Sequence, residues 1–154
     1  MPTSRKPTPT AAKHLKAASA DPQGRLADSI SSRVLSTLLN DGHAYRNDRD
    51  GYRLTAEDAL ATTAGPALIT LEGRRAVLSG PQLYSLARHV APDSRLAPNV
   101  TWQTANSLAE LRLVEYRDAT GRPRPTDGDN GRSGPVHYPF RTDLGRQVAE
   151  LAPA

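Results

Sequence analysis

The pattern of hydrophobic and polar positions changes its period once along residues 100–117. The apolar residues first recur at the spacing of one helix face: Val100, Ala105, Leu108 and Leu111. From residue 114 onward, apolar and charged residues alternate, which is the two-residue period of a half-buried strand. The pattern therefore predicts a helix over residues 100–112 that runs directly into a strand.

Other segments carry helical patterns together with start and stop signals. Residues 26–39 place their apolar side chains along one stripe, and Asp41-Gly42 supplies the stop. Three later helices are expected to begin at capping residues, namely Thr55, Ser79 and Thr142. The alanine-rich run from residue 11 to residue 20 predicts a further, weak helix.

Strand-like runs lie between these helices. Residues 43–54 contain two short runs around Asp50-Gly51, which predicts a hairpin. Residues 67–78 predict a strand pair that turns at Glu72-Gly73 and adds a strand beside the return strand 136–141. The fold class that follows is α+β, mostly helical, with a small antiparallel sheet.

The order of elements from Arg74 to Leu151 resembles the winged helix-turn-helix of bacterial transcriptional regulators. The matching residues are Leu86-Ala87, Leu108, Leu113-Val114, and the run from Tyr138 to Thr142 and Gly145. Two departures are Arg112, where the family usually has glycine, and a long connection over residues 89–99. The resemblance implies that residues 100–112 form a recognition helix and residues 117–141 a wing.

The first half of the chain matches this region in outline. Residues 26–66 give a helix, a hairpin, the sequence Tyr52-x-Leu-Thr55 and a second helix, in the order seen again over residues 108–151. We therefore expect residues 21–66 to be either a first winged-helix half or a dimerisation element. Residues 67–154 are expected to form the winged-helix DNA-binding domain.

The net charge of the chain is concentrated at its N-terminus. Arg5, Lys6, Lys13 and Lys16 account for the formal charge of +4, since the other basic residues are balanced by 16 acidic ones. Residues 1–20 are polar and rich in proline and threonine near their start, so we expect a disordered basic tail. We expect the cations of this tail to contact DNA phosphates whatever the base sequence.

Gln103 and Asn106 are the candidate base-reading residues. They lie three positions apart on the polar side of the predicted helix, and an amide side chain can pair with adenine through two hydrogen bonds. The alternative is that both amides only solubilise an exposed face. No Lys or Arg occurs in residues 96–111, so this helix lacks charge of its own for phosphate contacts.

Neighbouring side chains of the same helix suit backbone contacts. Thr101 and Ser107 can donate hydrogen bonds to phosphates. Trp102 could contact a thymine methyl group, although packing against the loop over residues 92–98 is the favoured role of this side chain.

The predicted wing supplies arginines. Gly121-Arg122-Pro-Arg124 resembles the core of an AT-hook, an extended arm whose arginines enter the minor groove of A·T-rich DNA. Arg117 and Arg132 add positive charge to the same connection. The alternative is a solvated loop tip without a binding role.

Catalytic and metal-binding signals are weak. The chain has no cysteine, its four histidines are scattered, and Asp127 to Gly131 begins like a calcium loop but meets Tyr138 where the bidentate glutamate would stand. We expect no enzyme activity, no metal and no cofactor. Neither a membrane-spanning run nor a signal peptide is recognisable, so the expected location is the cytoplasm.

The leading hypothesis is a sequence-specific double-stranded DNA-binding protein, a transcriptional regulator acting as a homodimer. The alternative is a winged-helix protein-interaction module, such as an assembly, replication or partition subunit, without specific DNA readout.

Overall fold

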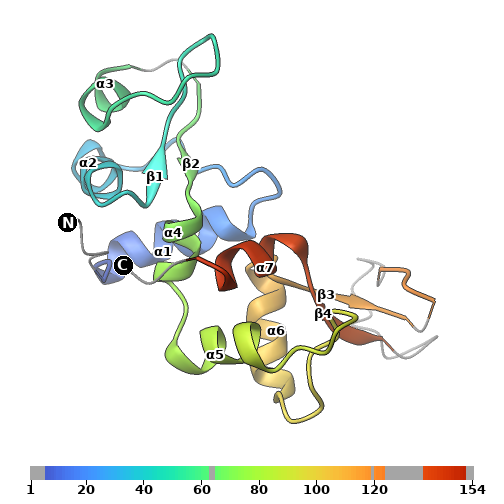
Figure 1. Cartoon of the computed structure of the whole chain (residues 1–154). Coiled ribbons are helices and arrows are strands. Elements are labelled where there is room, and N and C mark those ends of the chain that lie inside the picture. The colour runs from blue at the N-terminus through green and yellow to red at the C-terminus, as the bar shows by residue number, and fades with distance from the viewer. Residues whose placement is uncertain (1–5, 63–64, 119, 124–136, 152–154) are drawn as a thin grey trace. The chain divides into compact units, whose positions relative to one another are not determined.

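A computed structural model describes residues 6–62, 65–118, 120–123 and 137–151 (Figure 1). Within these residues the chain is α+β, with seven helices and two antiparallel pairs of strands. It divides into two compact units, which we call unit 1 (residues 1–78 and 151–154) and unit 2 (residues 79–150). The division falls between residues 78 and 79, twelve residues later than the sequence pattern indicates.

Unit 1 contains four helices and one strand pair. In chain order these are α1 (Pro9–Ala20), α2 (Ser32–Asn40), β1 (Ala44–Tyr45), α3 (Ala56–Ala61), β2 (Leu68–Ile69) and α4 (Leu71–Ala76). In the antiparallel β1–β2 pair, Ala44 lies opposite Ile69. A bridge between Arg25 and Leu68 brings the loop before α2 to the same strands.

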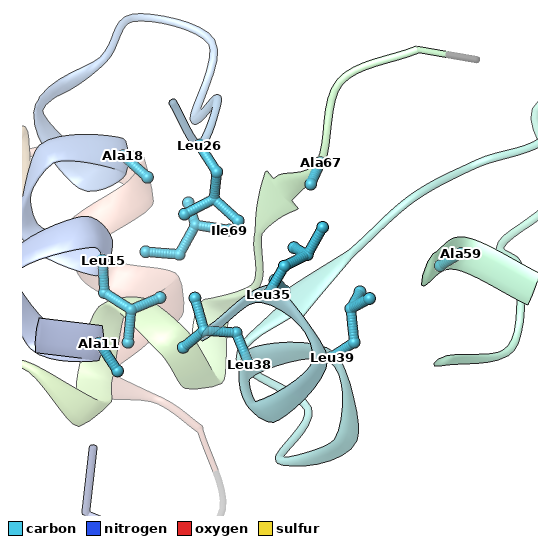
Figure 2. Close-up of a cluster of buried hydrophobic side chains, with 11 residues drawn as sticks. Ala11, Leu15, Ala18, Leu26, Leu35, Leu38, Leu39, Ala59, Ala67 and Ile69 are labelled. Atoms are coloured by element: carbon cyan, nitrogen blue, oxygen red, sulfur yellow. The ribbon is translucent and has the colours of Figure 1, made fainter. Parts of the chain in front are cut away.

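The core of unit 1 is formed by leucine, alanine and isoleucine side chains from these elements (Figure 2). Leu15 of α1 and Leu38 of α2 are fully buried, with Ile69 of β2 close to complete burial. Truncating a buried leucine to alanine costs about 2–5 kcal/mol, so this cluster fixes the arrangement of the helices.

Three expectations for unit 1 are corrected by the structure. The helix predicted over residues 11–20 is confirmed as α1, so these residues are not part of a disordered tail, and Ala11, Leu15 and Ala18 of this helix lie in the core. The helix expected over residues 26–39 begins only at Ser32, since the Ser31 hydroxyl caps it and the preceding residues form a loop.

The third correction concerns residues 67–78, where a strand pair was expected. Only β2 is a strand, and α4 follows it directly because the Thr70 hydroxyl accepts a hydrogen bond from the N–H of Gly73 at 2.9 Å. Glu72 and Gly73 therefore lie in the first turn of a helix and not at a hairpin turn.

Unit 2 contains α5 (Gly80–Arg88), α6 (Trp102–Glu110), β3 (Val114–Arg117), β4 (Tyr138–Arg141) and α7 (Asp143–Ala149). The helix and strand predicted over residues 100–117 are confirmed, as are the caps at Ser79 and Thr142. In the antiparallel β3–β4 pair, Val114 lies opposite Arg141. The buried side chains are Leu86, Leu96, Ala105, Leu108, Leu111, Leu113, Val114 and Val148.

Apart from α3, which has no counterpart in the described residues of unit 2, the two units share the same order of elements and the same backbone hydrogen bonds where a helix meets a strand. In unit 1 the N–H of His43 donates to the carbonyl of Leu38 at 2.9 Å, and in unit 2 the N–H of Leu113 donates to that of Leu108 at 3.0 Å. The N–H of Thr70 then donates to the His43 carbonyl at 3.0 Å. The matching bond in unit 2 joins Thr142 to the Leu113 carbonyl at 3.1 Å.

A Thr-x-x-Gly sequence forms this junction in both units. The Thr70 hydroxyl donates to the carbonyl of Gly42 at 2.7 Å, and the Thr142 hydroxyl donates to that of Arg112 at 3.0 Å. Each hydroxyl also accepts the N–H of the glycine three residues on. The residue that corresponds to Thr142 is therefore Thr70, and not Thr55 as the outline of the sequence indicates.

The turn after the first strand is also shared. Asp48 N–H donates to the Tyr52 carbonyl at 2.8 Å, and Asp118 N–H donates to the Arg122 carbonyl at 2.9 Å. Because the carboxylate of each aspartate accepts backbone N–H groups of its own turn, both turns have a fixed shape. The hairpin predicted over residues 43–54 is thus confirmed around this turn.

Candidate nucleic-acid interface

The first turn of α6 presents two large side chains to solvent. The Thr101 hydroxyl accepts the N–H of Thr104 at 3.3 Å and so defines where the helix begins. Trp102 follows immediately and is 68% exposed, and Gln103 beside it is also exposed. The expectation that Trp102 packs against the loop over residues 92–98 is wrong, because a packed indole would not keep that exposure.

The second turn of α6 is tied to its own unit. Asn106 and Ser107 are half-buried, and the Asn106 side-chain carbonyl accepts a hydrogen bond from the Tyr116 hydroxyl of β3. The Ser107 hydroxyl accepts a bond from the Gln82 amide of α5 at 2.8 Å and donates to the Thr104 carbonyl. These bonds hold α6 against α5 and β3, so Gln103 is the more accessible of the two amides.

The connection between α5 and α6 is longer than the three or four residues of a simple helix-turn-helix. It folds back on itself through a bridge between Val90 and Leu96, and Arg95 forms a second bridge with Phe140 of β4. The Arg95 guanidinium lies 3.7 Å from the centre of the Tyr138 ring. Unit 2 therefore places an additional extended segment beside its strand pair.

Known protein families, curated proteins and solved structures give no match to this chain.

The arginines expected in the wing have different surroundings. Arg117 pairs with Glu115 at 2.9 Å and lies near the ring of Phe140, so an internal carboxylate already compensates its charge. Arg122 is exposed at the turn. Arg124 and Arg132 lie outside the described residues, as does the segment compared with a calcium loop.

The turn itself is ordered by a carboxylate. Asp118 accepts a hydrogen bond from the Thr120 hydroxyl at 2.6 Å and from the N–H of Arg122 at 3.0 Å. The hydrogen bond from the Thr120 side chain is the main reason that the pKa of Asp118 is lowered. Because this carboxylate stays ionised and faces its own turn, it fixes the backbone from which the Arg122 side chain projects.

Sequence reasoning did not include Arg112 among the site residues. Its backbone has φ of 64°, in the left-handed region, just after the end of α6, and its side chain is exposed. The signal was present as an arginine at the position where the resembled family usually has glycine. This arginine adds a cation beside a helix that has none.

The N-terminal cations also have different surroundings. Arg5 lies outside the described residues, and Lys6 is exposed before α1. Lys13 and Lys16 are exposed on α1, whose other side lies in the core of unit 1. They are therefore surface charges at fixed backbone positions.

Searches for other kinds of site bear only on the part of the chain that the structure describes. There, no group of three or more His, Asp or Glu side chains is arranged to hold a metal ion. No helix in the same residues combines the length and the apolar character needed to cross a membrane.

Proposed function

We propose that unit 2 binds double-stranded DNA, with α6 in the major groove and the connection after β3 on the adjacent backbone or minor groove. The observation that carries this proposal is the exposed pair Trp102 and Gln103 at the start of a helix that is braced from behind. A helix with side chains is about 10–12 Å across, which suits the width of the major groove, about 12 Å. On this proposal unit 2 acts as a winged helix.

The bonds behind α6 support a reading role. Because Tyr116 holds Asn106 and Gln82 holds Ser107, the helix cannot rotate freely on its unit. A rigid helix loses little conformational entropy when it binds, which favours specific contacts at its exposed first turn. Gln103 would read a base edge, while Thr101 and Trp102 would contact sugar or phosphate.

The shared junctions and turns support the idea of a tandem pair of winged-helix halves. A role in transcriptional regulation, in the cytoplasm and as a homodimer, is the form of this proposal that the family resemblance suggests. Arg112 and Arg122 are exposed cations of unit 2 that would supply phosphate contacts, and the exposed Lys6 of unit 1 would add one of its own.

The test begins with selection of a preferred site from random duplex DNA. Replacing Gln103 by alanine should then cost about 1–3 kcal/mol of binding free energy on the selected duplex and little on a scrambled one. Asn106→Ala is a poorer test, because it also removes the acceptor of the Tyr116 hydroxyl. Equal losses on both duplexes would contradict base reading by Gln103.

A second function is favoured by one observation. An indole that is 68% exposed on a helix without Lys or Arg is also what a protein-docking surface presents. In that case Trp102 would be the anchor, and Trp102→Ala would abolish binding to a protein partner. Duplex binding that Gln103→Ala weakens on the selected site but not on a scrambled one favours the first function, and an absence of duplex affinity favours the second.

A further inference from the structure

α2 occupies in unit 1 the place that α6 occupies in unit 2. Ser31 caps α2 as Thr101 caps α6, through a hydroxyl that accepts the N–H three residues on. Leu38 and Leu108 are the fully buried leucines of the two helices. Since the same backbone bond leads from each leucine into the following strand, the two helices present equivalent faces to solvent.

The exposed face of α2 has the chemistry that α6 lacks. Arg33 stands at the position of Gln103 and is exposed, and Ser32 and Thr37 beside it carry hydroxyls. No acidic side chain occurs within α2 itself. A helix face of one arginine with hydroxyl and amide groups complements a phosphate backbone or the edge of a guanine.

Helix α3, which lies between the two strands of unit 1, leaves the exposed face of α2 open. α3 packs on α2 from the side of the buried leucines, where Ala59 lies near Leu39 (Figure 2). Arg46 holds the end of α3 by donating to the carbonyls of Ala59 and Thr62 at 2.7 and 2.6 Å. Arg33 is therefore not covered by the segment that unit 1 adds after its turn.

The turns after β1 and β3 also differ in the side chain that they expose. Tyr52 stands at the position of Arg122 and is 73% exposed. Unit 1 thus offers an arginine on its helix and an aromatic ring on its turn, whereas unit 2 offers an aromatic ring on its helix and an arginine on its turn. The Arg33 guanidinium and the Tyr52 hydroxyl are both groups that donate hydrogen bonds to phosphates.

We propose that unit 1 is a second duplex-binding surface, centred on Arg33 of α2, and that one chain contacts double-stranded DNA through both units. This inference rests on the proposed function of unit 2. It replaces the homodimer part of that proposal, because a single chain would supply the two helices that a regulator of this kind otherwise obtains by pairing two copies.

The experiment compares matched variants on the duplex selected by the wild-type chain. Arg33→Ala removes the cation from α2, and Arg88→Ala removes the same charge from an exposed position on α5, outside both proposed helices. Ser32→Glu adds a negative charge at the first position of α2, where an acidic side chain favours the helix but repels phosphates. Stoichiometry, backbone footprints and thermal unfolding midpoints are measured for each protein.

The expected result is a complex of one chain per duplex with two protected stretches. Arg33→Ala and Ser32→Glu should each weaken binding at least about fivefold and remove one stretch, whereas Gln103→Ala should remove the other. The unfolding midpoints of both α2 variants should stay close to that of the wild type, which excludes loss of the fold as the cause.

Three results would overturn the inference. One is a single protected stretch per chain, and another is two chains per duplex with each contributing one stretch. The third is an Arg33→Ala variant that binds no more weakly than Arg88→Ala. In each of these cases the wild type still binds and still depends on Gln103, so the proposed function of unit 2 survives. A wild-type chain that binds no duplex overturns both.

Discussion

Unit 1 and unit 2 build the same junction between helix and strand from partly different residues. Gly73 and Gly145 are the same because a Cβ atom at either position would lie 2.3 or 2.2 Å from a backbone carbonyl oxygen. Gly42 and Arg112 differ, since a Cβ at Gly42 would meet nothing within 4 Å. The comparison teaches that the space around the Cβ position, and not the backbone hydrogen bonds alone, decides which positions must be glycine.

A second difference links two positions within each unit. In unit 1, buried Arg74 donates to Ser19 at 3.2 Å, and a Cβ at Gly24 would lie 2.9 Å from its guanidinium. In unit 2 the corresponding arginine, Arg146, pairs instead with Asp143 at 2.6 Å on the surface. Ser94 can therefore stand at the position of Gly24, although both residues have a positive φ.

The largest effect on stability is expected from substitutions that break the shared junction. Gly73→Ala and Gly145→Ala should each lower the free energy of unfolding by about 3 kcal/mol, because the added methyl group meets a carbonyl that cannot move without losing its hydrogen bond. Chemical denaturation measures the loss. Gly80→Ala is the matched control, since its Cβ meets nothing within 4 Å and should change stability by less than about 0.5 kcal/mol.

If the junction variants were as stable as the control, the close approach of α4 to the His43 carbonyl and of α7 to the Leu113 carbonyl would not be needed for folding. Loss of stability in Gly73→Ala alone would show that unit 2 tolerates a looser junction than unit 1.

The next effect is a pH dependence of stability that arises in unit 1. His43 is fully buried where unit 2 has Leu113, and burial lowers its pKa, with Asp41 and Glu72 opposing the shift. The unfolded chain therefore binds a proton as the pH falls through about 6.5, before the folded chain does. Stability should be complete above that pH and should decrease below it, by at most about 1.4 kcal/mol per pH unit.

His43→Leu checks this assignment by giving unit 1 the residue of unit 2. Between pH 7.5 and pH 5.5, the thermal unfolding midpoint of His43→Leu should vary less with pH than that of the wild type. The difference is the part of the pH dependence that His43 causes. An unchanged pH dependence in His43→Leu would mean that other groups cause it.

The smallest effect exchanges residues at the left-handed position. Arg112→Gly should stabilise unit 2 by no more than about 1 kcal/mol, because relief of a left-handed conformation is partly offset by the entropy of glycine in the unfolded chain. Gly42→Ala should destabilise unit 1 by about 1 kcal/mol. Equilibrium unfolding of both variants gives the two signs, and equal signs would contradict the equivalence of these positions.

Helix starts were predictable from the sequence because capping is a local interaction. Thr55, Ser79 and Thr142 each accept the N–H three residues on, as their spacing indicates. In residues 67–78 the first predicted strand is present as β2, but helix α4 was not predicted, because the sequence pattern indicates a turn at Gly73. Its real role, close approach to the His43 carbonyl, depends on a contact distant in sequence.

Two further features depend on tertiary contacts and were not predicted. One is the burial of α1: its helical conformation was predicted, whereas Leu15 is buried because it packs in one cluster with side chains of α2 and β2. Because Ala11, Leu15 and Ala18 lie in the core of unit 1, the charges of Lys13 and Lys16 are tested by single substitutions and not by truncation. In the candidate site, exposure of Gln103 was predicted, whereas the bond that holds Asn106 required the position of Tyr116.

The most direct test of DNA binding is a titration of the full chain with the selected duplex at several salt concentrations. Each phosphate contact adds about 0.9 to the magnitude of the slope of log affinity against log salt. Contacts from Arg112, Arg122 and Lys6 predict a slope of about 2 to 3 or more in magnitude, with tighter binding to the selected duplex than to a scrambled one. Absence of duplex affinity at low salt, or affinity that salt does not change, would contradict the account.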